Sequence, residues 1–263
     1  MTEIFLSGLL LGIAAGLSAG LFGIGGGVLV VPFLTWLFEA QGFQTQHILL
    51  MAIATSLGTA IFTSTASVIS HHRLNNIIWP RALRLSPSML LGAFAGAVTA
   101  KYIVGDSLRI LFIVYLVYTG LKMAFPQGSP SAGSIKYPRL DYPVGFFIGT
   151  LSALLGIGGG TMTVPYLANR GLLMRNAVAT SSTCAIPITL SAAASYILLG
   201  WNNEHLPMGS LGYIYLPAFF GIIVTSMMSA PIGAKLATRL PSLKLKRYFA
   251  IIILLIAVKM ALS

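Results

Sequence analysis

Long apolar runs are the feature that most constrains how this chain can fold. A helix of roughly 20 apolar residues crosses a bilayer core about 30 Å thick. Hydrophobic residues make up 56% of the chain and charged residues only 8%, whereas a soluble domain has about 25% charged residues. The apolar runs cover residues 5–38, 48–70, 85–104, 108–125, 142–167, 177–200, 211–234 and 245–262. We therefore predict an all-α, multi-pass integral membrane protein whose partner is the lipid bilayer.

The basic residues report on membrane topology. Sixteen Lys and Arg stand against five Asp and Glu, and most of them lie between the apolar runs. Loop bias of this kind sets membrane orientation, so we expect no nucleic-acid partner. Cys184 is the only cysteine, and no run carries histidines and carboxylates at metal-ligand spacing, so we expect neither a metal nor a cofactor. His71 and His72 precede Arg73 at the end of a run, and we expect both at the membrane interface.

The sequence contains an internal duplication. Gly-Ile-Gly-Gly-Gly at 23–27 recurs at 156–160, and Ala-Thr-Ser at 54–56 recurs at 179–181. Leu-Arg at 108–109 and Lys-Met at 122–123 match Leu-Lys at 245–246 and Lys-Met at 259–260. A stretch rich in Gly, Ser and Pro lies between the two copies, which is typical of a linker. We predict a first repeat at 1–125, a cytoplasmic linker at 126–141 and a second repeat at 142–263.

Charge and length together predict that the repeats are inverted. If each glycine run crossed the membrane once, the cytoplasmic side would hold only six of the sixteen basic residues. If each segment that contains a glycine run instead enters and leaves the membrane on the same side, the cytoplasmic side holds thirteen of the sixteen basic residues. The positive-inside rule favours this second arrangement. The run 5–38 would be about 51 Å long as one helix, which suits two short half-helices. Each repeat is then a glycine-broken helical hairpin plus three transmembrane helices, and both termini are non-cytoplasmic.

The repeated motifs resemble those of the sulfite exporter TauE/SafE family of membrane proteins. The resemblance rests on the duplicated G-x-G-G-G-x-x-x-x-P at 23–32 and 156–165, on the two Ala-Thr-Ser motifs and on the Leu-Arg/Lys and Lys-Met pairs. It covers nearly the whole chain. It implies a transporter of small anions, commonly sulfur-containing ones such as sulfite or organosulfonates, in the plasma (inner) membrane of a prokaryote.

The glycine runs are the first candidates for substrate contact. Irregular backbone at membrane depth is tolerated only in a protein interior or beside a polar cavity. A break there points the N–H groups and positive dipole end of the following half-helix at an anion. The alternative is close helix packing, which accounts well for Gly92 and Gly96. The candidates are Gly23, Gly25, Gly26, Gly27, Gly156, Gly158, Gly159 and Gly160. Neither run is followed by Gly-Lys-Ser/Thr, so a nucleotide-binding P-loop is excluded.

Hydroxyl side chains near the runs are the second group of candidates. A hydroxyl can donate to an anion without adding charge; the alternative is a bond back to a helix carbonyl. These candidates are Thr55, Ser56, Thr161, Thr180 and Ser181. Pro32 and Pro165 follow the two glycine runs and are expected to mark the helix breaks, because proline frees a carbonyl and kinks a helix.

These features predict a secondary or facilitated transporter of a small anion, working by alternating access with its site between the two glycine turns. We expect no enzyme activity, because no nucleophile and base are paired and no carboxylate relay lies within a run. The first alternative is an anion or small-solute channel on the same fold, and the second is an intramembrane enzyme or a scaffold. The particular anion, the coupling ion, the direction of flux and the oligomeric state stay open.

Overall fold

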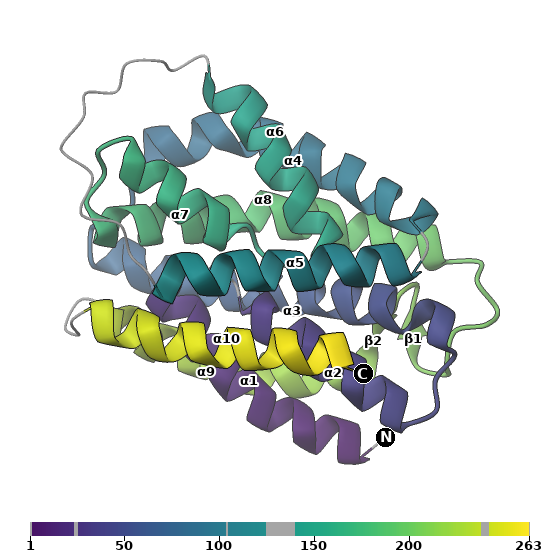
Figure 1. Ribbon diagram of the computed structural model, residues 1–263. Helices are drawn as coiled ribbons and strands as arrows, with labels where there is room; N and C mark the ends of the chain where they lie inside the picture. Colours follow the sequence, from purple (N-terminus) through teal and green to yellow (C-terminus); the bar gives the residue numbers. More distant parts are fainter. Residues whose placement is uncertain (1, 24–25, 104, 125–139, 238–241, 263) are drawn as a thin grey trace.

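The computed structural model describes residues 2–23, 26–103, 105–124, 140–237 and 242–262. Almost all of this part is helical (Figure 1). The first half contains α1 (Thr2–Phe22), α2 (Gly27–Ala40), α3 (Thr45–Arg73), α4 (Trp79–Tyr102) and α5 (Gly105–Ala124). The second contains α6 (Asp141–Leu154), α7 (Gly160–Asn169), α8 (Met174–Gly200), β1 (Ser210–Leu211), β2 (Ile214–Tyr215), α9 (Leu216–Ala237) and α10 (Ser242–Leu262).

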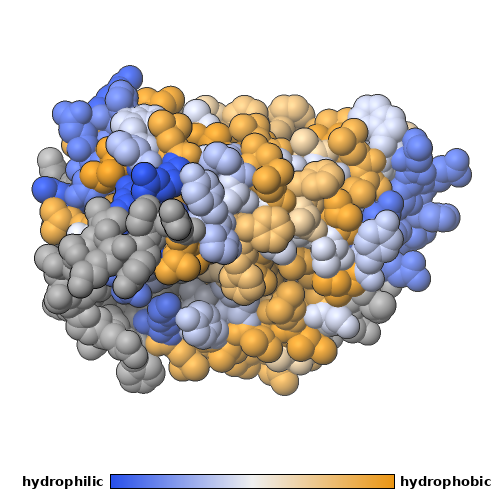
Figure 2. All heavy atoms as spheres, turned by 90° about the horizontal axis from the view of Figure 1, so that it is seen from above, coloured by the Kyte–Doolittle hydropathy of each residue, from blue (hydrophilic) through white to orange (hydrophobic). Residues whose placement is uncertain are grey.

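Five of these helices, α1, α3, α4, α8 and α9, are long and apolar enough to cross a membrane. On the face that Figure 2 shows, apolar residues form a broad band across the middle and polar residues gather at the two ends. A bilayer accommodates this distribution, because the band meets the acyl chains and the ends meet water and headgroups. The prediction of an all-α, multi-pass membrane protein is confirmed.

The helices pack in pairs that recur between the two halves. α1 packs on α9 as α6 packs on α4, and α2 packs on α3 as α7 packs on α8. α3 and α8 face each other in the middle, and α5 lies beside α10. Five elements of one half therefore match five elements of the other, each in the same order along the chain.

Small residues allow the two tightest pairs to form. A methyl group at Gly92 would overlap the carbonyl of Phe146, and one at Gly96 would overlap the carbonyl of Thr150, so α4 and α6 meet backbone to backbone. The same holds for α1 and α9, where Gly12 and Gly16 lie against the Ile222 and Ser226 carbonyls. Within a bilayer the hydrophobic effect does not drive helices together, so the van der Waals contact that glycine allows is a main source of their association. The helix-packing interpretation of Gly92 and Gly96 agrees with these contacts.

Several of the described basic residues lie at the two ends of the helix bundle. Arg73 ends α3, Arg81 and Arg84 lie in the first turns of α4, and Arg170 and Arg175 flank the turn between α7 and α8. These segments meet, because Asn176 Nδ2 donates to the carbonyl of Asn76 at 2.8 Å. We call this the basic end. Lys101 and Arg109 lie at the opposite end, where the start of α1 and the end of α10 also lie (Figure 1).

Three details differ from what the sequence predicts. The run 5–38 was predicted to form two short half-helices, but the first of them, α1, is 21 residues long. The apolar run 211–234 begins with a two-stranded hairpin, pairing Leu211 with Ile214, and only then enters α9. Asp141, placed in the linker, is the first residue of α6. Residues 126–139 of the predicted linker lie outside the described residues.

Candidate functional site

The two glycine turns adopt the same backbone conformation. Gly23 and Gly156 both have φ of 67°, and Gly26 and Gly159 have φ of 77° and 80°. These left-handed values are favourable only for glycine. The helix before the first turn ends at Phe22 and the helix before the second ends at Leu154. The next helix starts directly after the last left-handed glycine of each turn. Ile24 and Gly25 of the first turn lie outside the described residues.

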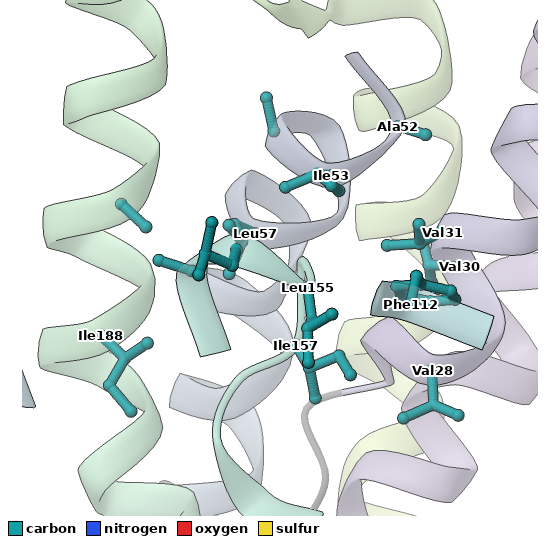
Figure 3. Close-up of a cluster of buried hydrophobic side chains, with 14 of the residues drawn as sticks. Val28, Val30, Val31, Ala52, Ile53, Leu57, Phe112, Leu155, Ile157 and Ile188 are labelled. Atoms are coloured by element: carbon teal, nitrogen blue, oxygen red, sulfur yellow. The ribbon is translucent and has the colours of Figure 1, made fainter. Parts of the chain in front are cut away.

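The turns touch each other in the buried centre of the molecule. A Cβ atom at Gly27 would overlap the carbonyl oxygen of Gly156, so the start of α2 lies directly against the second turn. A Cβ at Gly23 would approach the Val178 carbonyl to 2.8 Å. Figure 3 shows apolar side chains around this contact, with Ile157 between α3 and the start of α2. Backbone groups rather than charged side chains therefore define the centre.

Two helix N-termini start at this contact. The first residues of α2 and α7 follow Gly26 and Gly159, and no side chain caps either start in the part of the chain that the structure describes. The Gly26 carbonyl accepts from Leu29 and Val30, as the Gly159 carbonyl does from Met162 and Thr163. The N–H groups of the preceding helical residues remain at the positive ends of both helices. Such ends attract anions.

The prolines do not stand at the breaks. Pro32 lies inside α2 and Pro165 inside α7, each five residues after the first residue of its helix. Both helices continue past them, so the glycines alone interrupt the helical path. The prolines deprive one carbonyl in the first turn of each helix of its partner.

The two Ala-Thr-Ser motifs bind backbone of the opposite half. Ser56 Oγ donates to the Gly156 carbonyl at 2.8 Å, and Ser181 Oγ faces the Gly23 carbonyl at 3.5 Å. Thr55 Oγ1 accepts from the Tyr215 N–H at 3.0 Å, and Thr180 Oγ1 accepts from the Ile78 N–H at 3.1 Å. All four are buried. Each serine thus holds the other half's glycine turn, and each threonine holds the segment that precedes α9 or α4.

The remaining site candidates lie on α7 and at its start. Gly158 and Gly160 are buried, and Gly160 is the first residue of α7. The Thr161 hydroxyl is hydrogen-bonded to the Tyr115 hydroxyl of α5. Thr161 therefore connects the start of α7 to α5 and lies beside the uncapped helix end.

Replacing Ser56 by alanine is expected to lower the free energy of unfolding by about 1–3 kcal/mol, because it leaves the buried Gly156 carbonyl without this donor. Ser181→Ala is expected to cost less, because a contact of 3.5 Å is at the limit of hydrogen bonding. Thermal unfolding of the two variants in detergent measures the difference. Equal midpoints for both variants would contradict this ranking.

An ion pair at the basic end escaped the sequence analysis. Arg81 Nη1 lies 2.9 Å from Asp141 Oδ2, with side chains 10% and 1% exposed. The Tyr166 hydroxyl donates to the other oxygen of Asp141 at 2.5 Å. The network joins α4, α6 and α7. Asp141 is the last residue of the predicted linker, 126–141, so only its position in the fold could reveal that it is buried.

A helical, multi-pass protein with two buried helix breaks has the architecture of membrane transporters built on discontinuous helices. Comparison with known proteins agrees with that class. The profile described as "Sulfite exporter TauE/SafE" matches residues 8–260, and the chain belongs to this family.

Two relatives carry the same kind of name. A "Probable membrane transporter protein" of Haemophilus influenzae is 34% identical over 256 residues, which cover 97% of each chain. A protein with the corresponding name from Methanocaldococcus jannaschii is 30% identical over 227 residues, 85% of this chain and 80% of its own. The protein is therefore a membrane transporter and not an enzyme.

Proposed function

We propose that the protein is a secondary or facilitated transporter of a small sulfur-containing anion, such as sulfite or an organosulfonate, and that it works by alternating access. The observation that carries the proposal is the pair of uncapped helix starts, α2 and α7, which meet in the buried centre at left-handed glycines. N–H groups and dipole ends at both starts favour a negative solute. The substrate class is the one that the family's name states.

The anion site in this proposal consists of the glycines of both turns together with Thr161. The described neighbours of the turn glycines are apolar side chains, hydroxyls and backbone, among them Val178, Ile53 and Ile188. A site without a full positive charge binds an anion weakly enough to release it. Thr55, Ser56, Thr180 and Ser181 hold the turns and adjoining segments in place through the bonds described above. Because Gly27 lies directly on Gly156, the two turns must separate for an anion to pass between them.

We infer further that the halves 1–125 and 142–263 are inverted repeats. The match between helix pairs in the two halves supports this inference. The concentration of Arg73, Arg81, Arg84, Arg170 and Arg175 at the basic end supports a cytoplasmic position for that end. Both termini are then non-cytoplasmic, in the inner membrane of a prokaryote. An inside-negative potential would favour export of each negative charge by about 2.3 kcal/mol per 100 mV.

Uptake into proteoliposomes tests the proposal. We expect sulfite or methanesulfonate uptake to saturate and to show counterflow, with chloride and acetate as comparison anions. If one charge moves uncoupled, an inside-positive potential of about 100 mV raises equilibrium accumulation about 50-fold; electroneutral coupling removes this effect. Linear flux without counterflow would identify a channel, and no flux of any anion would contradict the proposal.

A further inference from the structure

One face of α3 carries polar side chains from the level of the glycine turns to the basic end. Thr59, Thr63, Ser64, Ser67 and His71 recur at intervals of one to four residues, and each is at most 2% exposed. Residues three, four and seven apart lie on the same side of a helix. The buried face therefore runs along the half of α3 that leads away from Ser56, which holds the second glycine turn.

Two members of this face have unused hydrogen-bonding groups. Thr63 Oγ1 bonds to Ser226 Oγ at 2.9 Å and Ser67 Oγ to Ser182 Oγ at 3.2 Å. Among the described residues, Ser64 Oγ and both ring nitrogens of His71 are buried without a partner. The backbone of Gly20 lies close enough to the His71 ring to interact with it, but neither ring nitrogen meets the geometry of a hydrogen bond. Buried polar groups are nearly always paired, so those left unpaired need an explanation.

The second half shows that the fold does not require this polar face. The positions 125 residues after Thr63, Ser64, Ser67 and His71 are Ile188, Thr189, Ala192 and Tyr196. Two of these are apolar, and the other two have partners. Thr189 Oγ1 donates to the Ala185 carbonyl of its own helix, and the Tyr196 hydroxyl donates to the Ala153 carbonyl. At these positions α8 therefore packs without unpaired polar groups among the described residues, whereas α3, its counterpart in the first half, does not.

The two ends of the molecule also differ in the kind of side chain that fills the core there. Toward the opposite end, Phe38, Phe43 and Tyr215 pack against one another with ring centroids 5.2–5.5 Å apart, Phe38 and Phe43 stacked and Tyr215 edge-on to both. Phe38 is 0% exposed and Tyr215 3%, so this aromatic cluster closes the core above α2. Among the described residues, His47 Nδ1 and Ser210 Oγ are also unpaired at this opposite end, but both belong to residues that are only partly buried. The unpaired groups of fully buried residues, Ser64 and His71, lead from the glycine turns toward the basic end.

We propose that this face of α3 lines the route by which the anion passes between the glycine turns and the basic end, with Ser64 and His71 as successive donors. The inference rests on the proposed anion transport. The two residues are seven positions apart, about 10.5 Å along the helix axis, so a small oxyanion meets them one after the other. A hydroxyl and an imidazole N–H each donate to an oxyanion without requiring a carboxylate or a metal.

The test combines transport with stability. His71→Leu and Ser64→Ala remove one donor each, and His72→Leu is the matched control, because His72 is the exposed neighbour whose ring contacts Trp79 edge-on. In sulfite uptake by proteoliposomes, each donor variant is expected to raise the half-saturation concentration about tenfold or more. The anion-free thermal midpoint is expected to stay unchanged or rise, because no protein partner is lost. His72→Leu is expected to behave as wild type.

A merely structural role gives the opposite pattern. A lower anion-free midpoint with unchanged half-saturation in His71→Leu and Ser64→Ala would overturn the inference while sulfite transport itself stands. His71→Gln keeps an N–H donor and is expected to recover most of the affinity that is lost in His71→Leu. If His71→Leu does not fold, His71→Gln and Ser64→Ala together test the inference. Wild-type protein that moves no anion would overturn the proposed function, and this inference with it.

Discussion

Gly26→Ala and Gly159→Ala are expected to reduce sulfite transport about tenfold or more, whereas Gly42→Ala transports as wild type. All three glycines have a left-handed backbone, with φ of 77°, 80° and 72°. Alanine in this conformation costs about 1–2 kcal/mol at each. The three variants therefore share the same backbone strain and differ in where the strain is relieved.

The surroundings of the three glycines decide the functional outcome. A Cβ at Gly42 meets nothing within 4 Å, so the loop after α2 can absorb the strain locally. A Cβ at Gly26 lies 2.9 Å from the Ala15 carbonyl, and one at Gly159 lies 2.6 Å from the end of the Ile188 side chain. At Gly26 the obstacle is backbone, so relieving the strain moves the start of α2. At Gly159 the Ile188 side chain can shift, and the left-handed backbone strain itself moves the start of α7. Either movement displaces the N–H groups proposed to bind the anion.

Proteoliposome uptake and thermal unfolding of the same preparations separate strain from function. Comparable losses of stability in all three variants, with transport lost only in Gly26→Ala and Gly159→Ala, are the expected result. Wild-type transport by both turn variants would contradict the assignment of the glycine turns as the anion site. It would leave membership of the transporter family untouched.

Asp141→Asn is expected to lower the free energy of unfolding by about 3–5 kcal/mol. The substitution leaves the guanidinium of Arg81, only 10% exposed, without its charged partner, and an unpaired buried charge is costly. Tyr166 also loses a charged acceptor, so the contacts among α4, α6 and α7 weaken together. Thermal unfolding in detergent measures the loss.

The double variant Arg81→Met/Asp141→Leu provides the control. Removing both charges removes the desolvation penalty along with the attraction, and such replacements are often neutral or stabilising. We therefore expect the double variant to be more stable than Asp141→Asn alone. A double variant less stable than Asp141→Asn would show that the ion pair contributes a large net stabilisation. It would contradict our account of where the cost arises.

Local sequence predicted those features of the fold that depend on composition and spacing. The apolar run 48–70 corresponds to α3 and 177–200 to α8, because the thickness of the bilayer sets the length of a crossing helix. The glycine turns were predicted as helix breaks, because consecutive glycines destabilise a helix in any context. The family resemblance, carried by the same motifs, is confirmed by the match over residues 8–260.

The partners of individual polar side chains could not be predicted. His71 was expected at the membrane interface from its neighbour Arg73; it does lie in the last turn of α3, but its side chain is 1% exposed and faces the protein interior. The position of a residue near the end of an apolar run does not reveal whether its side chain faces the neighbouring helices or the surroundings of the protein. The Ala-Thr-Ser serines were candidates for donating to an anion, yet Ser56 donates to a carbonyl 100 residues away.

The sequence by itself determined the membrane class, the helical segments, the duplication and the two places where helices break. These follow from hydrophobicity, length and the conformational freedom of glycine, which act on a few neighbouring residues at a time. Only the tertiary structure decided that Gly27 lies against Gly156, that Asp141 pairs with Arg81, and that Ser64 and His71 are buried with unpaired groups among the described residues. These contacts join segments distant in the chain, so they depend on how the two halves pack together and are not encoded in any local pattern.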